Sequence, residues 1–183
     1  MVTTTVSKQA EAHNDLGVAY HLEQKLDLAV KEYEQAIGID SEFADAHNNL
    51  GVAYYSLGEI ELAIEEFHKA IRQDPGLAQT HYNLGIAYKA KGKLDSAMDE
   101  FQIAIEINPA DADTHFSLAG MYEALGRLGE AIESYRRFTE LAPPEDIHLV
   151  KIAEEKVLQL VKMIRKDRLE QLRVHSLPVL AAC

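Results

Sequence analysis

The sequence predicts an all-α fold, a solenoid of four helical hairpins followed by a C-terminal capping helix. Two observations carry this prediction: the sequence repeats at a shift of 34 residues, and small, apolar and aromatic residues recur within each repeat at helical spacing. A third is the segment that follows Pro143 and Pro144, which contains no glycine or proline up to residue 173. With 47% hydrophobic residues in 183, the chain can bury one continuous core.

The repeats follow an N-terminal extension at 1–9 and occupy four units without a change of register. Position 7 of every unit is leucine, position 11 is tyrosine, position 20 is alanine, position 24 is tyrosine or phenylalanine, and position 8 is glycine or alanine. On a helix, positions 4, 7, 8 and 11 share one face of the first helix, and positions 20, 24 and 27 share one face of the second. Small residues therefore let paired helices approach closely, and the aromatic rings pack beside them. The four units are residues 10–43, 44–77, 78–111 and 112–145.

The turns are indicated by glycine and proline. Gly58, Gly92 and Gly126 stand where a first helix must end, and we expect them to adopt the left-handed conformation of a helix C-cap. Proline at position 32 stops the second helix in the last three units. The first repeat, residues 10–43, has Gln24 and Ser41 at these positions, so we expect its turns to be the loosest.

This length and spacing resembles the tetratricopeptide repeat family, over about 136 of the 183 residues. The resemblance implies a right-handed α-solenoid whose first helices line a concave groove. It also implies a scaffold that binds proteins, because stacked repeats bury each other's faces and leave an extended surface for a partner.

Charge and composition exclude some classes of partner and indicate the cellular compartment. The chain has 30 acidic and 18 basic residues, a net charge of −12, so we expect no binding to nucleic acid. The single cysteine, Cys183, forms no internal disulfide, which fits a reducing compartment. The N-terminal segment lacks a signal-like pattern, and no apolar run approaches the roughly 18 to 20 residues that span a bilayer. We therefore expect a cytoplasmic protein.

No residue pattern predicts catalysis, a cofactor or a metal. Histidine fills position 4 of every unit, but successive repeats stand about 8 to 10 Å apart, too far for neighbouring imidazoles to share one metal ion. We interpret the column as packing. The pairs Glu65-Glu66 and Asp99-Glu100 are expected on the outward, solvated side of second helices. No nucleophile or phosphate-loop motif is present, so we expect a protein that is not an enzyme.

Candidate binding residues lie on the groove side of the first helices. Asn49 and Asn83 at position 6 could each hold a peptide unit of an extended ligand, and they resemble the asparagine ladder of O-linked N-acetylglucosamine transferase repeats, although Asp15 and Ser117 depart from it. The alternative is that these side chains only pack against the next repeat. The groove lacks the lysine and arginine residues that form a carboxylate clamp in other members of the family. Glu11, Asp45 and Asp113 favour a neutral or basic ligand segment. The predicted peptide-binding groove comprises Asn14, Asp15, Val18, Asn48, Asn49, Val52, Tyr55, Tyr82, Asn83, Ile86 and Phe116.

The C-terminal helix, predicted at 146–173, has more apolar residues than one face can hold. The stripe from Val150 to Ile164 is expected to cover the fourth hairpin. The apolar residues outside this stripe leave three roles open for the helix. It could be a cap alone, a cap that also forms a homo-oligomer, or a helix that contacts a membrane through Lys162, Arg165, Lys166, Arg168 and Arg173. Residues 174–183 are expected to be a flexible tail. The leading hypothesis is an adaptor that binds a partner's peptide segment in the groove; the second is an assembly factor docked on a membrane complex through this helix.

Overall fold

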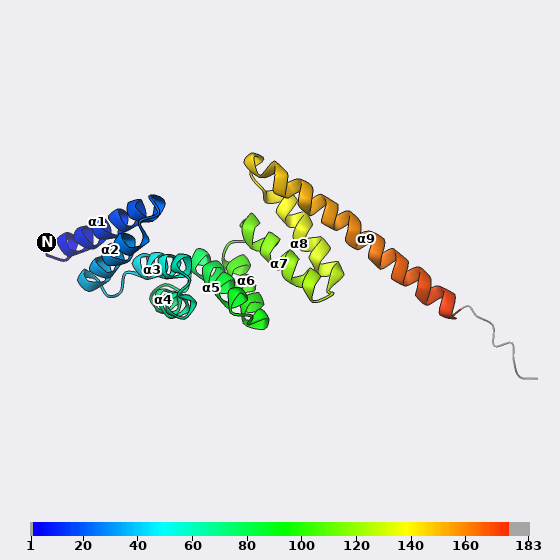
Figure 1. Ribbon diagram of the computed structural model, residues 1–183, viewed down its shortest axis with the longest axis horizontal. Helices are drawn as coiled ribbons and strands as arrows, with labels where there is room; N and C mark the ends of the chain where they lie inside the picture. Colours follow the sequence, from blue (N-terminus) through cyan, green and yellow to red (C-terminus); the bar gives the residue numbers. More distant parts are fainter. Residues whose placement is uncertain (1, 176–183) are drawn as a thin grey trace, which may run out of the picture. The chain divides into compact units, whose positions relative to one another are not determined.

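The structure is a computed structural model that describes the backbone of residues 2–175 and the side chains of residues 8–171. Within these limits every regular element is a helix, so the predicted all-α class is confirmed (Figure 1). Most of the predicted flexible tail, residues 176–183, lies outside the described residues, while 174 and 175 are the last residues of a helix.

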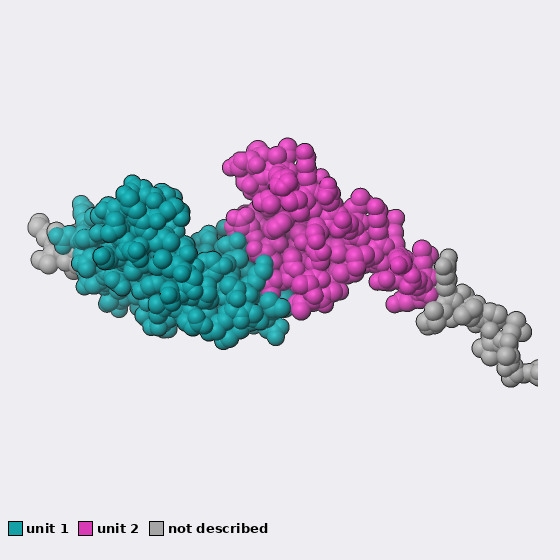
Figure 2. Space-filling model, in the orientation of Figure 1, with its two compact units in different colours: residues 1–109 teal, residues 110–183 magenta. Residues whose placement is uncertain are grey.

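The chain divides into two compact units, residues 1–109 and 110–183 (Figure 2). Unit 1 contains three hairpins in which each helix packs on its partner and each second helix packs on the next first helix. Their bounds are α1 Val2–Leu22, α2 Leu26–Ile39, α3 Ala44–Leu57, α4 Ile60–Gln73, α5 Ala78–Ala90 and α6 Leu94–Ile107. Helix α1 thus begins within the segment predicted as an N-terminal extension.

Unit 2 contains the fourth hairpin and the C-terminal helix. Its elements are α7 Ala112–Ala124, α8 Leu128–Leu141, a short 3-10 turn η1 Pro144–Asp146 and α9 Ile147–His175. Ala153 and Leu160 of α9 are fully buried against α8, which confirms that the predicted stripe covers the fourth hairpin. Figure 1 shows α9 running on beyond α8, and there Ile164, at the end of the stripe, is 38% exposed. No helix in the described part of the chain is long and apolar enough to cross a membrane.

The turns inside the hairpins follow one geometry. Gly58, Gly92 and Gly126 have φ of +84°, +77° and +71°, so the predicted left-handed caps are confirmed. In each, the next residue's N–H donates to the carbonyl of the position-11 tyrosine, as in Lys93 N to Tyr88 O at 2.9 Å. Gln24 takes φ +60° and makes the same turn without glycine, since Lys25 N donates to Tyr20 O.

Close helix approach accounts for the small-residue columns. The alanines at positions 20 and 27 of unit 1 are at most 1% exposed. At position 8, a Cβ added to Gly51 would stand 2.6 Å from the Phe67 ring, and one on Gly85 would stand 2.6 Å from the Phe101 ring. The position-24 ring therefore occupies the space that glycine leaves open, and the predicted packing of rings beside small residues is confirmed.

Candidate protein-interaction surface

The first helices of unit 1 bring their position-5 and position-6 amides together in one hydrogen-bonded chain, here called the amide chain. Asn83 Nδ2 donates to Asn48 Oδ1 at 3.0 Å, Asn48 Nδ2 donates to Asn49 Oδ1 at 3.3 Å, and Asn49 Nδ2 donates to Asn14 Oδ1 at 2.9 Å. Gln79 Nε2 extends the chain by donating to Asn83 Oδ1 at 3.2 Å. The chain thus crosses from α5 to α3 to α1 and ties three repeats together.

The predicted contact of Asn49 and Asn83 with a ligand stays a prediction. Both side chains are half-buried and donate to amides of the preceding repeat. The reason is that positions 5 and 6 of neighbouring first helices lie within reach of one another. A carboxamide has two N–H hydrogens and two acceptor lone pairs, so each still has hydrogen-bonding capacity beyond the amide chain.

Two apolar hollows lie beside the amide chain, one for each pair of neighbouring repeats in unit 1. The first measures about 150 Å³ and is lined by Val18, His21, Leu22, Tyr33, Asn49 and Val52. The second measures about 210 Å³ and is lined by Val52, Tyr55, Phe67, Tyr82, Asn83 and Ile86. Val18, Val52 and Ile86 all occupy position 9, and Asn49 and Asn83 both occupy position 6. The hollows are therefore repeats of one another, and Val52 belongs to both.

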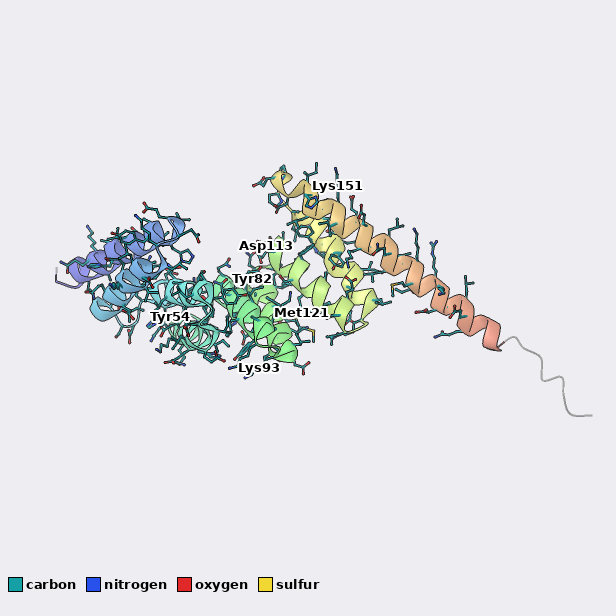
Figure 3. The ribbon with its side chains drawn as sticks, viewed as in Figure 1. Tyr54, Tyr82, Lys93, Asp113, Met121 and Lys151 are labelled. Atoms are coloured by element: carbon teal, nitrogen blue, oxygen red, sulfur yellow. The ribbon has the colours of Figure 1, made fainter. Side chains whose placement is uncertain are left out.

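Most of the predicted groove residues meet at this surface. Seven line the hollows, and Asn14 and Asn48 belong to the amide chain. Asp15 is exposed on α1 and lines neither hollow. Tyr82, labelled on α5 in Figure 3, packs its ring against Phe101 with centroids 5.7 Å apart.

Phe116 belongs to unit 2, whereas the other predicted residues belong to unit 1. Its ring packs edge-on against Phe138 at 4.8 Å and against Tyr135 at 5.7 Å between centroids. In this structure its contacts belong to the core of the fourth hairpin.

The histidine column forms pairs with glutamates that the sequence interpretation missed. His13 Nδ1 lies 2.7 Å from Glu32 Oε2, and the same distance separates His47 from Glu66 and His81 from Glu100. These glutamates all occupy position 23, and a shared 19-residue offset in the sequence could have revealed the pairing. The expectation that Glu66 and Glu100 are solvated is wrong, because Glu66 is only 8% exposed and Glu100 is half-buried.

Glu66 shows how the pair is held. Burial raises the pKa of its carboxyl, but hydrogen bonds from His47 and Lys69 outweigh burial, and the pKa lies below its ordinary value. On the other side of the ring, His47 Nε2 lies 3.2 Å from the Ser41 carbonyl, and His81 Nε2 lies 3.3 Å from the Pro75 carbonyl. The histidine therefore joins its own second helix to the loop of the preceding repeat, a structural role that agrees with the packing interpretation. In the described residues no cluster of three or more potential ligands could hold a metal ion.

Comparison with family models decides the relationship. A TPR repeat model matches residues 19–58 and 53–92, and a tetratricopeptide repeat model matches residues 82–146, so together they span more than half of the chain. The chain belongs to the tetratricopeptide repeat family. This confirms the resemblance inferred from the sequence, and with it the general class of protein-interaction scaffold. A search of curated proteins found no match.

Solved structures show the same fold. A crystal structure of MamA protein is 24% identical, with a TM-score of 0.68, covering 95% of this chain and 99% of that one. The first TPR of Spaghetti (RPAP3) bound to HSP90 peptide SRMEEVD is 22% identical, with a TM-score of 0.64, covering 66% of this chain and 95% of that one. Cut9 in the Cut9-Hcn1 hetero-tetramer of the APC/C gives 21% identity and a TM-score of 0.72, covering 83% of this chain and 30% of that one.

Proposed function

We propose that this tetratricopeptide repeat protein is a non-catalytic adaptor whose unit 1 binds an extended segment of a partner protein along its first helices. The observation that carries the proposal is the pair of repeat-related apolar hollows that share Val52. An apolar side chain of the partner enters each hollow. Apolar pockets with a few placed polar groups are the general form of a binding site.

The spacing of the hollows selects the backbone conformation of the ligand. Helices that pack directly stand about 8 to 10 Å apart, and we take this spacing for the first helices, because α1 contacts α3 and α3 contacts α5. A polyproline II segment rises about 3.1 Å per residue with three residues per turn, so residues i and i+3 lie on one face about 9 Å apart. A β-strand turns alternate residues to opposite faces and does not offer this match. The preferred ligand therefore carries apolar residues at i and i+3 in a polyproline II conformation.

The amide chain supplies the polar part of recognition. Each of Asn48, Asn49 and Asn83 uses one N–H within the chain, and the second N–H and a lone pair are able to meet ligand peptide groups. Because the amides already hold one another, little side-chain entropy is lost when the ligand binds. Backbone contacts of this kind are independent of the ligand's sequence.

The charge of unit 1 favours a basic or neutral ligand. Residues 1–109 contain 18 Asp and Glu against 8 Lys and Arg, a net charge of −10. Exposed Asp15 and Asp45 stand on the first helices that carry the hollows. Complementary charge mainly accelerates association, so added salt should weaken binding of basic segments.

The experiment is selection of random peptides displayed on phage against the full chain. We expect enriched peptides to carry two apolar residues three apart and an excess of Lys and Arg. Their binding should weaken about 10- to 100-fold in a Val52→Asn variant that still folds. Selection of peptides without this spacing, or of peptides whose binding ignores Val52, would refute the proposed site.

A further inference from the structure

The first hairpin leaves one side of α1 open where every later hairpin of unit 1 is covered. This end face consists of Ala12, His13 and Leu16 on α1 and Ile39 at the end of α2, around a hollow of about 350 Å³. Leu16 is 42% exposed, whereas its counterparts Leu50 and Leu84 are 4% and 0% exposed. Apolar residues of the end face therefore meet solvent where their counterparts in the later repeats are buried.

The inner repeats show what kind of element covers such a face. Leu50 is buried in one cluster with Tyr33 and Ile37 of α2, and Leu84 is buried in one cluster with Phe67 and Ile71 of α4. The cover is in both cases a second helix with apolar residues one turn apart. His47 and His81 also reach a loop carbonyl through Nε2, but for His13 the described residues provide only Glu32, at Nδ1. The end face is thus half of a helix-packing interface.

Helix α9 has a face that none of the described residues of unit 2 covers. It has 29 residues against 14 in α8, about 43 Å against about 21 Å at 1.5 Å per residue, so α8 covers only its first half. In repeat register, Ala153 of α9 takes position 8 and Leu160 takes position 15, where earlier repeats turn. Because the helix continues there, the part of the chain that the structure describes has no second helix that folds back over it.

The uncovered face of α9, here called the distal face, mixes apolar and basic residues. Leu158, Lys162, Arg165 and Leu169 follow one another at spacings of four, three and four residues, which places them on one side of the helix. All four are exposed, with Leu158 and Leu169 at 56% and 62%. The face is long enough to cover an apolar patch and to reach carboxylates beside it.

Charge selects the occupant of the end face. The first hairpin, residues 10–43, has eight Asp and Glu against two Lys and Arg, a net charge of −6. Residues 158–171 of α9 have four Lys and Arg against two Asp and Glu, a net charge of +2. Two distal faces would repel one another, whereas a distal face and a first hairpin attract.

We propose that the distal face of α9 in one copy of this chain packs on the end face of a second copy, head to tail. The two surfaces differ, so the contact is heterologous, and an open assembly keeps one unused surface at each of its two ends. This self-association is independent of the peptide-binding surface proposed above, since it uses neither the amide chain nor the two hollows.

Light scattering on the full chain during gel filtration tests this contact. Wild type should form dimers and longer assemblies as concentration rises, and high salt should reduce them. Leu16→Asp alone, or Leu158→Asp with Leu169→Asp, should make the protein monomeric. Leu62→Asp is the matched control, because Leu62 is also 42% exposed in unit 1 but lies outside the end face, and it should associate like wild type.

Mixing the two monomeric variants gives the decisive result. The Leu16→Asp copy retains an intact distal face and the double variant retains an intact end face, so the mixture should form a one-to-one dimer that does not grow. Failure of the mixture to dimerise would overturn the proposal, as would self-association that survives Leu16→Asp. A wild type that stays monomeric and instead floats with phosphatidylserine vesicles would also overturn it, in favour of membrane contact. Circular dichroism melting of each variant establishes that it is folded.

Discussion

The three repeats of unit 1 and the fourth repeat in unit 2 are all helical hairpins, but they differ at three positions where the first helix packs on the second. Unit 1 has glycine at position 8, glutamate at position 23 and alanine at position 27. The fourth repeat has Ala119, Ser134 and Phe138 at these positions, and Phe138 is fully buried. The three repeats of unit 1 thus have the same residues at these positions. The fourth hairpin instead packs around the aromatic rings of Phe116, Tyr135 and Phe138.

The difference reflects what each hairpin must hold. In unit 1 the amide chain joins like repeats to like repeats, and so do His47 and His81, because each also contacts a loop carbonyl of the preceding repeat. In unit 2, Glu123 of α7 accepts hydrogen bonds from Tyr135 Oη at 2.9 Å and from Lys156 Nζ of α9 at 2.8 Å. Glu123 therefore links α9 to the fourth hairpin. Each prediction below tests a contact on one side of this comparison.

The largest effect is expected at the histidine pairs of unit 1. His47→Ala removes both ring contacts and leaves buried Glu66 with only Lys69, which should lower the free energy of unfolding by about 2 to 3 kcal/mol. His13→Ala is the control, because the His13 side chain is 38% exposed and should matter much less. Urea unfolding measures both variants, and equal losses would contradict the joining role of the inner histidines.

In unit 1, replacing a position-8 glycine even by alanine should destabilise the fold. Gly51→Ala places a Cβ against the Phe67 ring, and the overpacking should cost about 1 to 3 kcal/mol. Gly38→Ala, in the same unit with nothing within 4 Å of the added Cβ, should instead stabilise α2 by about 0.5 to 1 kcal/mol. Thermal melting of the two variants compares them directly, and a neutral Gly51→Ala would argue against the close approach of α3 and α4.

The low pKa of Glu66 predicts a pH dependence on the acid side. A carboxyl whose pKa is lower in the folded state stabilises the fold fully above its ordinary pKa of 4.5, and that contribution is lost as pH falls through the folded value. Stability measured by urea unfolding should therefore drop as pH falls below 4.5, and Glu66→Gln should flatten the drop. Glu65→Gln, at the exposed neighbouring position, should leave the pH dependence unchanged.

The amide chain should contribute less, because Asn49 and Asn83 are only half-buried. Replacing Asn49 and Asn83 together by alanine removes two donors to the preceding repeats and should cost about 1 kcal/mol in all. Peptides selected on the wild type should also bind the double variant more weakly at a temperature where it is folded. A loss of stability with unchanged affinity would leave the amides a purely structural role.

The periodicity of the sequence predicted the fold closely, since columns such as Gly51 and Phe67 meet for the steric reason that their spacing implies. The left-handed turn at Gln24 could not be read from its residue type, because the geometry is imposed by the packing of α1 on α2. The link between Asn49 and Asn14 depends on how neighbouring first helices cross, which periodicity within one repeat does not specify. The burial of Glu66 escaped prediction because its partner, His47, lies on another helix.

The affinity of a selected peptide for two matched variants tests the central claim most directly. Val52 lines both hollows, so Val52→Asn puts a polar amide into apolar space and should weaken binding about 10- to 100-fold, equivalent to about 1.4 to 2.7 kcal/mol. Ile64→Asn is the control, because Ile64 packs against the same cluster as Val52 but lines neither hollow. Isothermal titration calorimetry at a temperature where both variants are folded should give wild-type affinity for Ile64→Asn and a large loss for Val52→Asn. Wild-type affinity for Val52→Asn would contradict the claim that the partner binds along the first helices of unit 1.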